Sequence, residues 1–146
     1  MAHTEKLIFK DNTMELIASI SASLGSSDFV TNINNDTHTW MADEPLEIGG
    51  SNQGPNPYEM MLSALSSCSA ITMKMYANRK AWPLQGVDIQ CDLVKPELNG
   101  TSFIQRKMSL KGPLDMEQTD RLLQIADLCP IHKMLSHGIV IVSQRV

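Results

Sequence analysis

The stretch from Met60 to Met73 contains no charged side chain, and this constrains the fold more than any other feature of the sequence. The residues before it are typical of a helix start. Asn56 suits the N-cap, Pro57 suits the first helical position, and a glutamate follows three residues after the cap. We predict a helix from this start to about Lys80, where Trp82-Pro83 ends it.

A helix without charge offers no face that suits bulk water, so we expect it to be buried on all sides. One stripe at helical spacing holds its larger apolar residues and a cysteine: Met61, Leu65, Cys68, Ile71 or Thr72, and Met75. Serines keep the other faces small, which lets a second helix approach closely. A chain of 146 residues has too few other residues to cover such a helix easily on every side. Burial against a second subunit would solve this problem, so we expect a homodimer.

Composition argues against several classes of partner. Hydrophobic residues make up 42% of the chain and charged residues 19%, which suits a globular core and not a disordered chain. The net charge of -4 and the few aromatic residues argue against binding to nucleic acid or to an anionic membrane. Residues 1–6 lack the apolar core of a signal peptide, and residues 60–73 are too short and serine-rich to span a bilayer. We expect a soluble cytoplasmic protein with reduced thiols.

Strand signals dominate the chain before this helix. Weak alternation over residues 16–20 predicts a first strand, followed by turn residues at 23–27. A second strand begins near Phe29, and the turn signal Asn34-Asn35-Asp36 returns the chain into a third strand over residues 37–41. This arrangement is a β-meander.

After the long helix, the sequence predicts a hairpin and two further helices. The hairpin strands are Val87–Leu93 and Phe103–Leu110, which flank a turn at Glu97–Gly100. The remaining elements are an amphipathic helix over residues 115–128, a short helix from Cys129-Pro130 to Gly138, and a closing strand over residues 139–142. Without internal repeats or a linker, residues 1–146 are predicted to form a single α+β domain.

The chain has three cysteines, with no CxxC motif and no Cys/His pair at zinc-finger spacing, so we expect neither a metal nor a cofactor. Cys91 lies on the apolar side of an alternating strand, where cysteine acts as a small hydrophobic residue. Cys68 lies in the helix stripe. It either packs there or reacts at a site built near a subunit interface. A buried thiol needs a nearby cation or donor to react.

Cys129 precedes Pro130 at a helix start, so its sulfur can approach unpaired backbone N–H groups and the positive end of the helix dipole. This position favours the thiolate. His132 and Lys133 lie within the next turn and can add positive charge. The alternative interpretation is that Cys129 only caps the helix at a helix–helix corner.

Two cysteine motifs stand in order along the chain. They are Gly54-Pro-Asn-Pro-Tyr-Glu-Met-Met-Leu-Ser-Ala-Leu-Ser-Ser-Cys68 and Cys129-Pro-Ile-His132. They resemble the first and the second cysteine motif of the OsmC/Ohr family. The phrase Arg79-Lys-Ala-Trp-Pro-Leu-Gln-Gly-Val87 resembles the OsmC-like branch. The resemblance covers nearly the whole chain. It implies the OsmC-like fold, an intertwined dimer with central long helices and cysteines near the subunit interface.

The resemblance also implies a thiol-dependent peroxidase for organic hydroperoxides. Cys68 would become a sulfenic acid, Cys129 would condense with it to a disulfide, and an external dithiol would reduce that disulfide. Family members place a glutamate two residues after the motif asparagine. This chain has Tyr58 there and Glu59 one position later, so both residues, with His132, are candidates for supporting roles.

A different reading of the same residues is a stress-associated binding protein. Its thiols would react weakly, and its methionine-rich, charge-free helix would help to hold an apolar ligand at the dimer interface. A third possibility is a dimeric scaffold in which both cysteines only pack.

Overall fold

The computed structural model of the protein describes residues 15–96 and 100–145. Contacts divide the chain into two compact units, residues 1–56 and 57–146, and we describe each by itself. The single-domain organisation stays a prediction. Residues 1–6, on which the prediction of no signal peptide rests, lie outside the described residues. No helix in the described ranges is long and apolar enough to cross a membrane.

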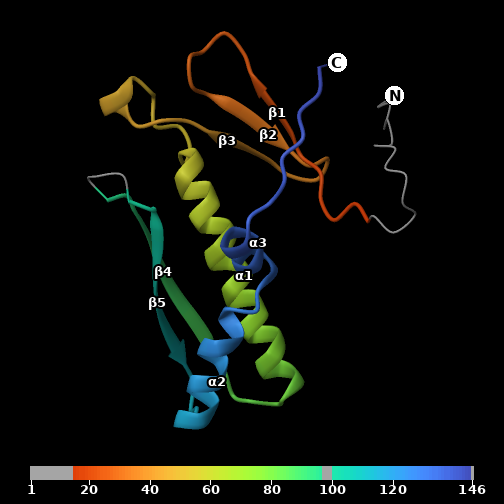
Figure 1. The fold of residues 1–146 in the computed structure, drawn as a ribbon, viewed down its shortest axis with the longest axis vertical. Coiled ribbons are helices and arrows are strands. Elements are labelled where there is room, and N and C mark those ends of the chain that lie inside the picture. The colour runs from red at the N-terminus through yellow and green to blue at the C-terminus, as the bar shows by residue number, and fades with distance from the viewer. Residues whose placement is uncertain (1–14, 97–99, 146) are drawn as a thin grey trace. The chain divides into compact units, whose positions relative to one another are not determined.

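The first unit contains an antiparallel sheet in the order β1-β2-β3 (Figure 1). Its strands are β1 Ser21–Leu24, β2 Thr31–Asn34 and β3 Thr39–Ala42. The predicted meander is therefore confirmed, and so is its turn. Asp36 adopts a left-handed conformation with φ of 68°, and the Asn35 side chain accepts the backbone N–H groups of Thr37 and His38.

The first strand was predicted too early in the chain. Residues 16–20 form no strand, and β1 includes Ser23 and Leu24, which we expected in a turn. The reason is register, because pairing of Ser21 with Asn34 and of Leu24 with Thr31 fixes where β1 begins and ends. Side-chain alternation alone does not contain that information.

A loop after β3 is organised around the carboxylate of Asp43, which is 1% exposed. This carboxylate accepts the backbone N–H groups of Glu44, Ser51 and Gln53 and the Ser51 hydroxyl. The N–H of Gln53, more than the others, lowers the pKa of the Asp43 carboxyl. The loop includes a short 3₁₀ helix, η1 Leu46–Ile48.

The second unit begins with the long helix α1, Pro57–Arg79, close to both predicted ends. Its buried residues recur every four positions, at Leu65, Ser69, Met73 and Ala77. The predicted stripe shares only Leu65 with this one. Of the predicted stripe, Met75 is 60% exposed, and Ile71, which was one of two choices with Thr72, is 58% exposed. A helix without charge has no polar face to reveal its inward side, so only packing decides which face is buried.

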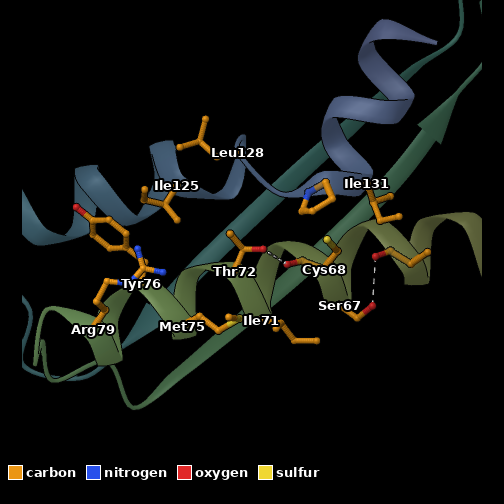
Figure 2. Close-up of a pocket in the computed structure, with 12 residues that line it drawn as sticks. Ser67, Cys68, Ile71, Thr72, Met75, Tyr76, Arg79, Ile125, Leu128 and Ile131 are labelled. Atoms are coloured by element: carbon orange, nitrogen blue, oxygen red, sulfur yellow. Dashed lines mark hydrogen bonds between the residues drawn. The ribbon is translucent and has the colours of Figure 1, made fainter. Parts of the chain in front are cut away.

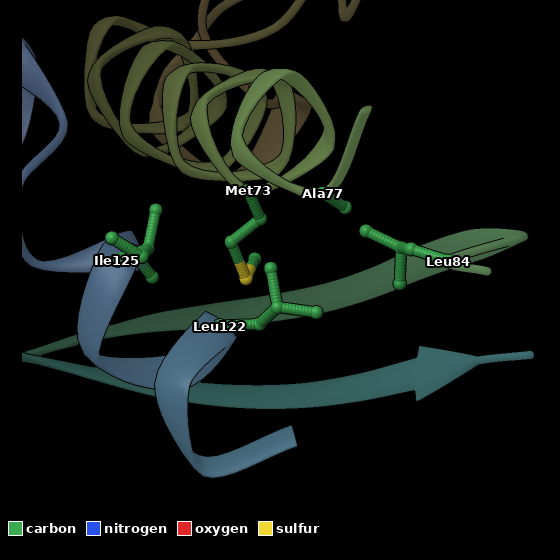
Figure 3. Close-up of a cluster of buried hydrophobic side chains, with 6 residues drawn as sticks. Met73, Ala77, Leu84, Leu122 and Ile125 are labelled. Carbon is green, nitrogen blue, oxygen red and sulfur yellow. The ribbon is translucent and has the colours of Figure 1, made fainter. Parts of the chain in front are cut away.

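The core of this unit lies where α1 meets the helix α2, Met116–Ala126. Figure 3 shows Met73 of α1 pointing toward Leu122 and Ile125 of α2, while Ala77 of α1 points toward Leu84; all five belong to one buried cluster. Met73 and Leu122 are completely buried. The start of α2 is well specified, because the Asp115 side chain and Gln118 form a reciprocal capping box.

A hairpin of β4, Gly86–Val94, and β5, Phe103–Lys111, packs against α1 through β4. Its register pairs Cys91 with Arg106. The two strands were predicted to within a residue or two, whereas the turn predicted at Glu97–Gly100 falls largely outside the described residues.

The last helix, α3 Pro130–His137, begins and ends where predicted, with Cys129 as N-cap and Gly138 after it. The closing strand over residues 139–142 is not formed. Their apolar side chains are 63% to 88% exposed. A strand requires a partner for its backbone hydrogen bonds, and in the described part of the chain these residues pair with none. The other α+β elements follow the predicted order.

Candidate active site

A cavity of about 680 Å³ opens along α1 in the second unit. Figure 2 shows that α1 forms one side of this cavity, while Ile125 of α2 and the segment leading into α3 form the other. Its lining residues are Ala64, Ser67, Cys68, Ile71, Thr72, Met75, Tyr76, Arg79, Ile125, Leu128, Pro130 and Ile131. Most of these side chains are apolar, which suits a ligand with a hydrocarbon portion.

Cys68 is the only cysteine among these lining residues, and it is half-buried. Burial, as the largest influence, raises the pKa of its thiol above the ordinary value, and the neighbouring Cys129 raises it further. The backbone N–H of Ile131 and the Thr72 hydroxyl act in the opposite direction but do not outweigh burial. The Thr72 hydroxyl already donates to the Cys68 carbonyl at 2.7 Å. In this environment Cys68 is mainly a thiol at neutral pH.

Cys129 occupies a different environment. It is completely buried and caps α3, with an extended backbone that places its sulfur beside the first turn. The backbone N–H of His132 donates to this sulfur at 3.2 Å. Pro130 at the first helical position starts the helix without leaving an unused N–H. The local sequence therefore dictates the cap, as predicted.

The fold brings Cys68 and Cys129 together from two different helices. Their side chains lie close enough for a hydrogen bond between them to contribute to the raised pKa of Cys68. All three cysteines are free thiols in this structure. Neighbouring side chains are a prerequisite for a disulfide.

A buried arginine on β5 completes the surroundings of Cys129. The Arg106 side chain is 10% exposed, and its Nη1 donates to Ser69 Oγ at 2.8 Å. Ser69 Oγ lies 3.6 Å from the Cys129 sulfur. The other guanidinium nitrogen of Arg106 forms an ion pair with Asp127 and lies 3.2 Å from His132 Nδ1. Because arginine only donates, His132 Nδ1 accepts here, so the neutral ring carries its proton on Nε2.

Sequence reasoning missed Arg106 and Ser69, although a signal for the arginine was available. Along β5 the less exposed positions alternate with exposed ones, and Arg106 falls on the inward set between Ile104 and Met108. A charged residue at an inward strand position needs a buried partner, which predicts a polar contact nearby. Ser69 gave no such signal, because it is one of several serines in the same stretch.

The remaining predicted residues divide into two groups. His132 lies beside Cys129, as described above. Tyr58 is 67% exposed and Glu59 is exposed, and neither is among the residues that line the cavity. Cys91 is not among the residues that line the cavity, and on the hairpin it pairs with Arg106. It is half-buried on β4 and accepts a hydrogen bond from Ser66 at 3.1 Å. Within the described ranges, no cluster of three or more His, Cys, Asp or Glu side chains could hold a metal ion.

Comparison with known proteins agrees with this fold. A family profile described as OsmC-like protein matches residues 50–144, so the chain belongs to the OsmC family. No curated protein matched the sequence.

Solved structures share the fold at low sequence identity. An OsmC-like protein from Mycoplasma pneumoniae has a TM-score of 0.67 and 18% identity, over 84% of this chain and 89% of the other. An organic hydroperoxide resistance protein OsmC from Legionella pneumophila has a TM-score of 0.61 and 17% identity, over 83% and 91%. The organic hydroperoxide resistance protein OhrB of Bacillus subtilis has a TM-score of 0.57 and 21% identity, over 81% and 89%.

Proposed function

We propose that this protein is a thiol-dependent peroxidase that reduces organic hydroperoxides through Cys68 and Cys129. The observation that carries this proposal is the position of Cys68 in an apolar cavity with Cys129 next to it. The hydrocarbon part of a hydroperoxide would lie against the apolar lining, and its O–O group would meet the Cys68 sulfur. Organic hydroperoxide resistance in the names of two structural neighbours supports this class of substrate.

The reaction proceeds in two chemical steps. The Cys68 thiolate attacks the terminal oxygen of the hydroperoxide, and the O–O bond breaks. The alkoxide leaves, takes a proton to become an alcohol, and Cys68 becomes a sulfenic acid. Cys129 then attacks the Cys68 sulfur and forms the disulfide, while the hydroxyl group leaves with the Cys129 proton as water. An external dithiol of the cytoplasm, where we place the protein, restores both thiols.

We include a homodimer in this proposal. Ile71 and Met75 are more than half exposed, although they belong to the cavity lining. Large apolar side chains grouped beside a site favour coverage by another surface. A second copy of the chain would bury them and remove more water from Cys68. Tyr58, Glu59 and His132 remain candidates for supporting roles.

Intact mass spectrometry tests the proposed reaction. Reduced protein mixed with a small excess of cumene hydroperoxide should lose the mass of two hydrogens, and peptide mapping should find Cys68 linked to Cys129. Cys68→Ser should abolish hydroperoxide consumption. Cys91→Ser is the matched control and should consume it normally, because Cys91 is not among the residues that line the cavity. Unchanged mass after exposure to the hydroperoxide would refute the proposal.

A second candidate function is the binding of an apolar ligand without catalysis. The raised pKa of Cys68 favours it, because the thiolate is the reactive form and is scarce at neutral pH. Native mass spectrometry distinguishes the two functions. A ligand retained by both the natural protein and Cys68→Ser, together with no hydroperoxide consumption, would support binding. Consumption that depends on Cys68 would exclude it as the main function.

A further inference from the structure

The chain of contacts that starts at Arg106 ends at the Cys129 sulfur, and the peroxide step at Cys68 described above does not use it directly. It starts at a side chain nine-tenths buried and passes through Ser69, which is completely buried, to a sulfur that is also completely buried. Charge effects are stronger in such an interior than in water. Asp127 balances the positive charge of Arg106 on one side, while the other terminal nitrogen of the guanidinium faces Ser69.

Hydrogen-bond chemistry fixes the direction of this chain. Arginine has donors only, so at 2.8 Å Ser69 Oγ accepts from Arg106. The single hydrogen of the Ser69 hydroxyl therefore remains available for the Cys129 sulfur at 3.6 Å. When Cys129 is a thiol, either atom can donate. When Cys129 is a thiolate, Ser69 must donate, and the guanidinium polarises its hydroxyl in that direction.

The thiolate of Cys129 would have two donors, the Ser69 hydroxyl and the backbone N–H of His132 at 3.2 Å. It would also lie at the N-terminus of α3, where the helix dipole favours negative charge. Cys68, in contrast, lines the cavity and can be reached by an incoming molecule. The two sulfurs thus differ in the properties that decide thiol–disulfide exchange, which are access for attack and stability of the leaving thiolate.

We propose that Arg106, acting through the Ser69 hydroxyl, is a positioning residue that stabilises the Cys129 thiolate, so that reduction of the Cys68–Cys129 disulfide is directed to Cys68. This inference rests on the proposed function, whose reductive half it specifies. The external thiolate attacks the Cys68 sulfur, the S–S bond breaks, and its electron pair leaves with Cys129. The second thiol of the external dithiol then attacks the mixed disulfide at the reductant's own sulfur, releases the Cys68 thiolate, and leaves the reductant oxidised.

The first test titrates Cys129 by thiolate absorbance in the Cys68→Ser background, which needs neither a disulfide nor a peroxide. Adding Arg106→Gln or Ser69→Ala should raise the midpoint of the Cys129 titration by about one pH unit, the effect expected from losing one charge-assisted hydrogen bond. Ser69→Thr keeps a hydroxyl, so the midpoint of its Cys129 titration should lie close to that of the Cys68→Ser parent. Lys107→Gln is the matched control, because Lys107 follows Arg106 on β5 but is 63% exposed.

A purely structural role for Arg106 predicts a different outcome. Its bonds to Asp127 and to the Ala126 carbonyl also join β5 to the end of α2, so Arg106→Gln should lower the melting temperature under either interpretation. Only the proposed role predicts that Arg106→Gln and Ser69→Ala raise the midpoint of the Cys129 titration while Ser69→Thr leaves it nearly unchanged. An unchanged midpoint in both Arg106→Gln and Ser69→Ala would overturn the proposal.

The second test locates the attack. Oxidation with diamide forms the disulfide without a hydroperoxide, and 2-mercaptoethanol then cleaves it before an acid quench and peptide mapping. Mercaptoethanol should be found on Cys68 and a free thiol on Cys129, and Ser69→Ala should slow cleavage roughly threefold or more. Adducts mainly on Cys129 would refute the directed attack. Because diamide replaces the hydroperoxide, failure of the peroxidase function would leave this result interpretable.

Discussion

The side chains of Cys68 and Cys129 lie next to each other, but only that of Cys68 lines the cavity, whereas Cys129 is completely buried. This difference separates their chemistry. Cys68 can meet a substrate but has a raised pKa, while Cys129 receives a backbone N–H and lies beside a serine held by arginine. A site that uses both thiols therefore has one sulfur, on Cys68, that a substrate can reach and another, on Cys129, that lies beside hydrogen-bond donors.

Alkylation of Cys68 should accelerate with pH beyond the range of an ordinary thiol. Because burial raises its pKa, the rate with iodoacetamide should still be rising above pH about 8.5, the value for a free cysteine. Peptide mapping of alkylated Cys68 at a series of pH values measures this, and the urea-unfolded protein is the control. If the alkylation rate reached half of its maximum at a pH below about 8.5, the raised pKa of Cys68 would be contradicted.

The same raised pKa predicts how stability changes with pH. The folded protein holds the Cys68 proton more tightly than the unfolded chain, so this contribution is complete below the unfolded pKa. It is lost as the pH rises through the folded pKa. Stability measured by urea unfolding should therefore fall in alkaline solution, and Cys68→Ser should reduce that fall. An equal fall in both proteins would assign the effect to other groups.

Asp43→Asn should destabilise the first unit in a pH-dependent way. The carboxylate accepts four hydrogen bonds and has a lowered pKa, so its contribution is present above the unfolded value of about 3.9 and is lost as the pH falls through the folded pKa. The urea midpoints of the two proteins should differ most near neutral pH and converge in acid. Asp28→Asn, at an exposed acid of the same unit, should change the midpoint little.

Gly50→Ala should destabilise the protein by about 2 kcal/mol or more, a typical cost of overpacking. A Cβ at residue 50 would lie 1.8 Å from the Glu44 carbonyl oxygen, which is backbone and cannot rotate away. Gly25→Ala is the matched control, because no atom lies within 4 Å of a Cβ there. Denaturant unfolding of both variants measures the difference. Equal stabilities would show that the loop yields easily.

Leu122→Ala should cost about 2–5 kcal/mol, because it opens a cavity at a completely buried position between α2 and α1. Met116→Ala on the same helix removes a side chain that is 84% exposed and should change stability by less than about 0.5 kcal/mol. Thermal and urea unfolding measure both. A small effect of Leu122→Ala would mean that the buried cluster between α1 and α2 contributes little to the stability of the fold.

Local sequence determined the elements of this protein and several of their ends. Pro57 starts α1, Asp115 with Gln118 starts α2, and Cys129-Pro130 starts α3, because each signal acts on backbone groups within a few residues. The motifs around Cys68 and Cys129 likewise indicated the family, which the profile match over residues 50–144 confirms. Their chemical roles stay proposals.

Tertiary structure alone decided which groups meet. The inward face of α1 was chosen by packing of Met73 and Ala77 against α2, since a charge-free helix has no polar face to orient it. The same packing places Ser69 between Arg106 and Cys129, three residues from three different elements. Their contact depends on the register of β5 and the position of α3, which no local pattern contains. The sequence thus determined where the two cysteines stand, and the fold decided that one lines a cavity while the other lies beside a buried charge.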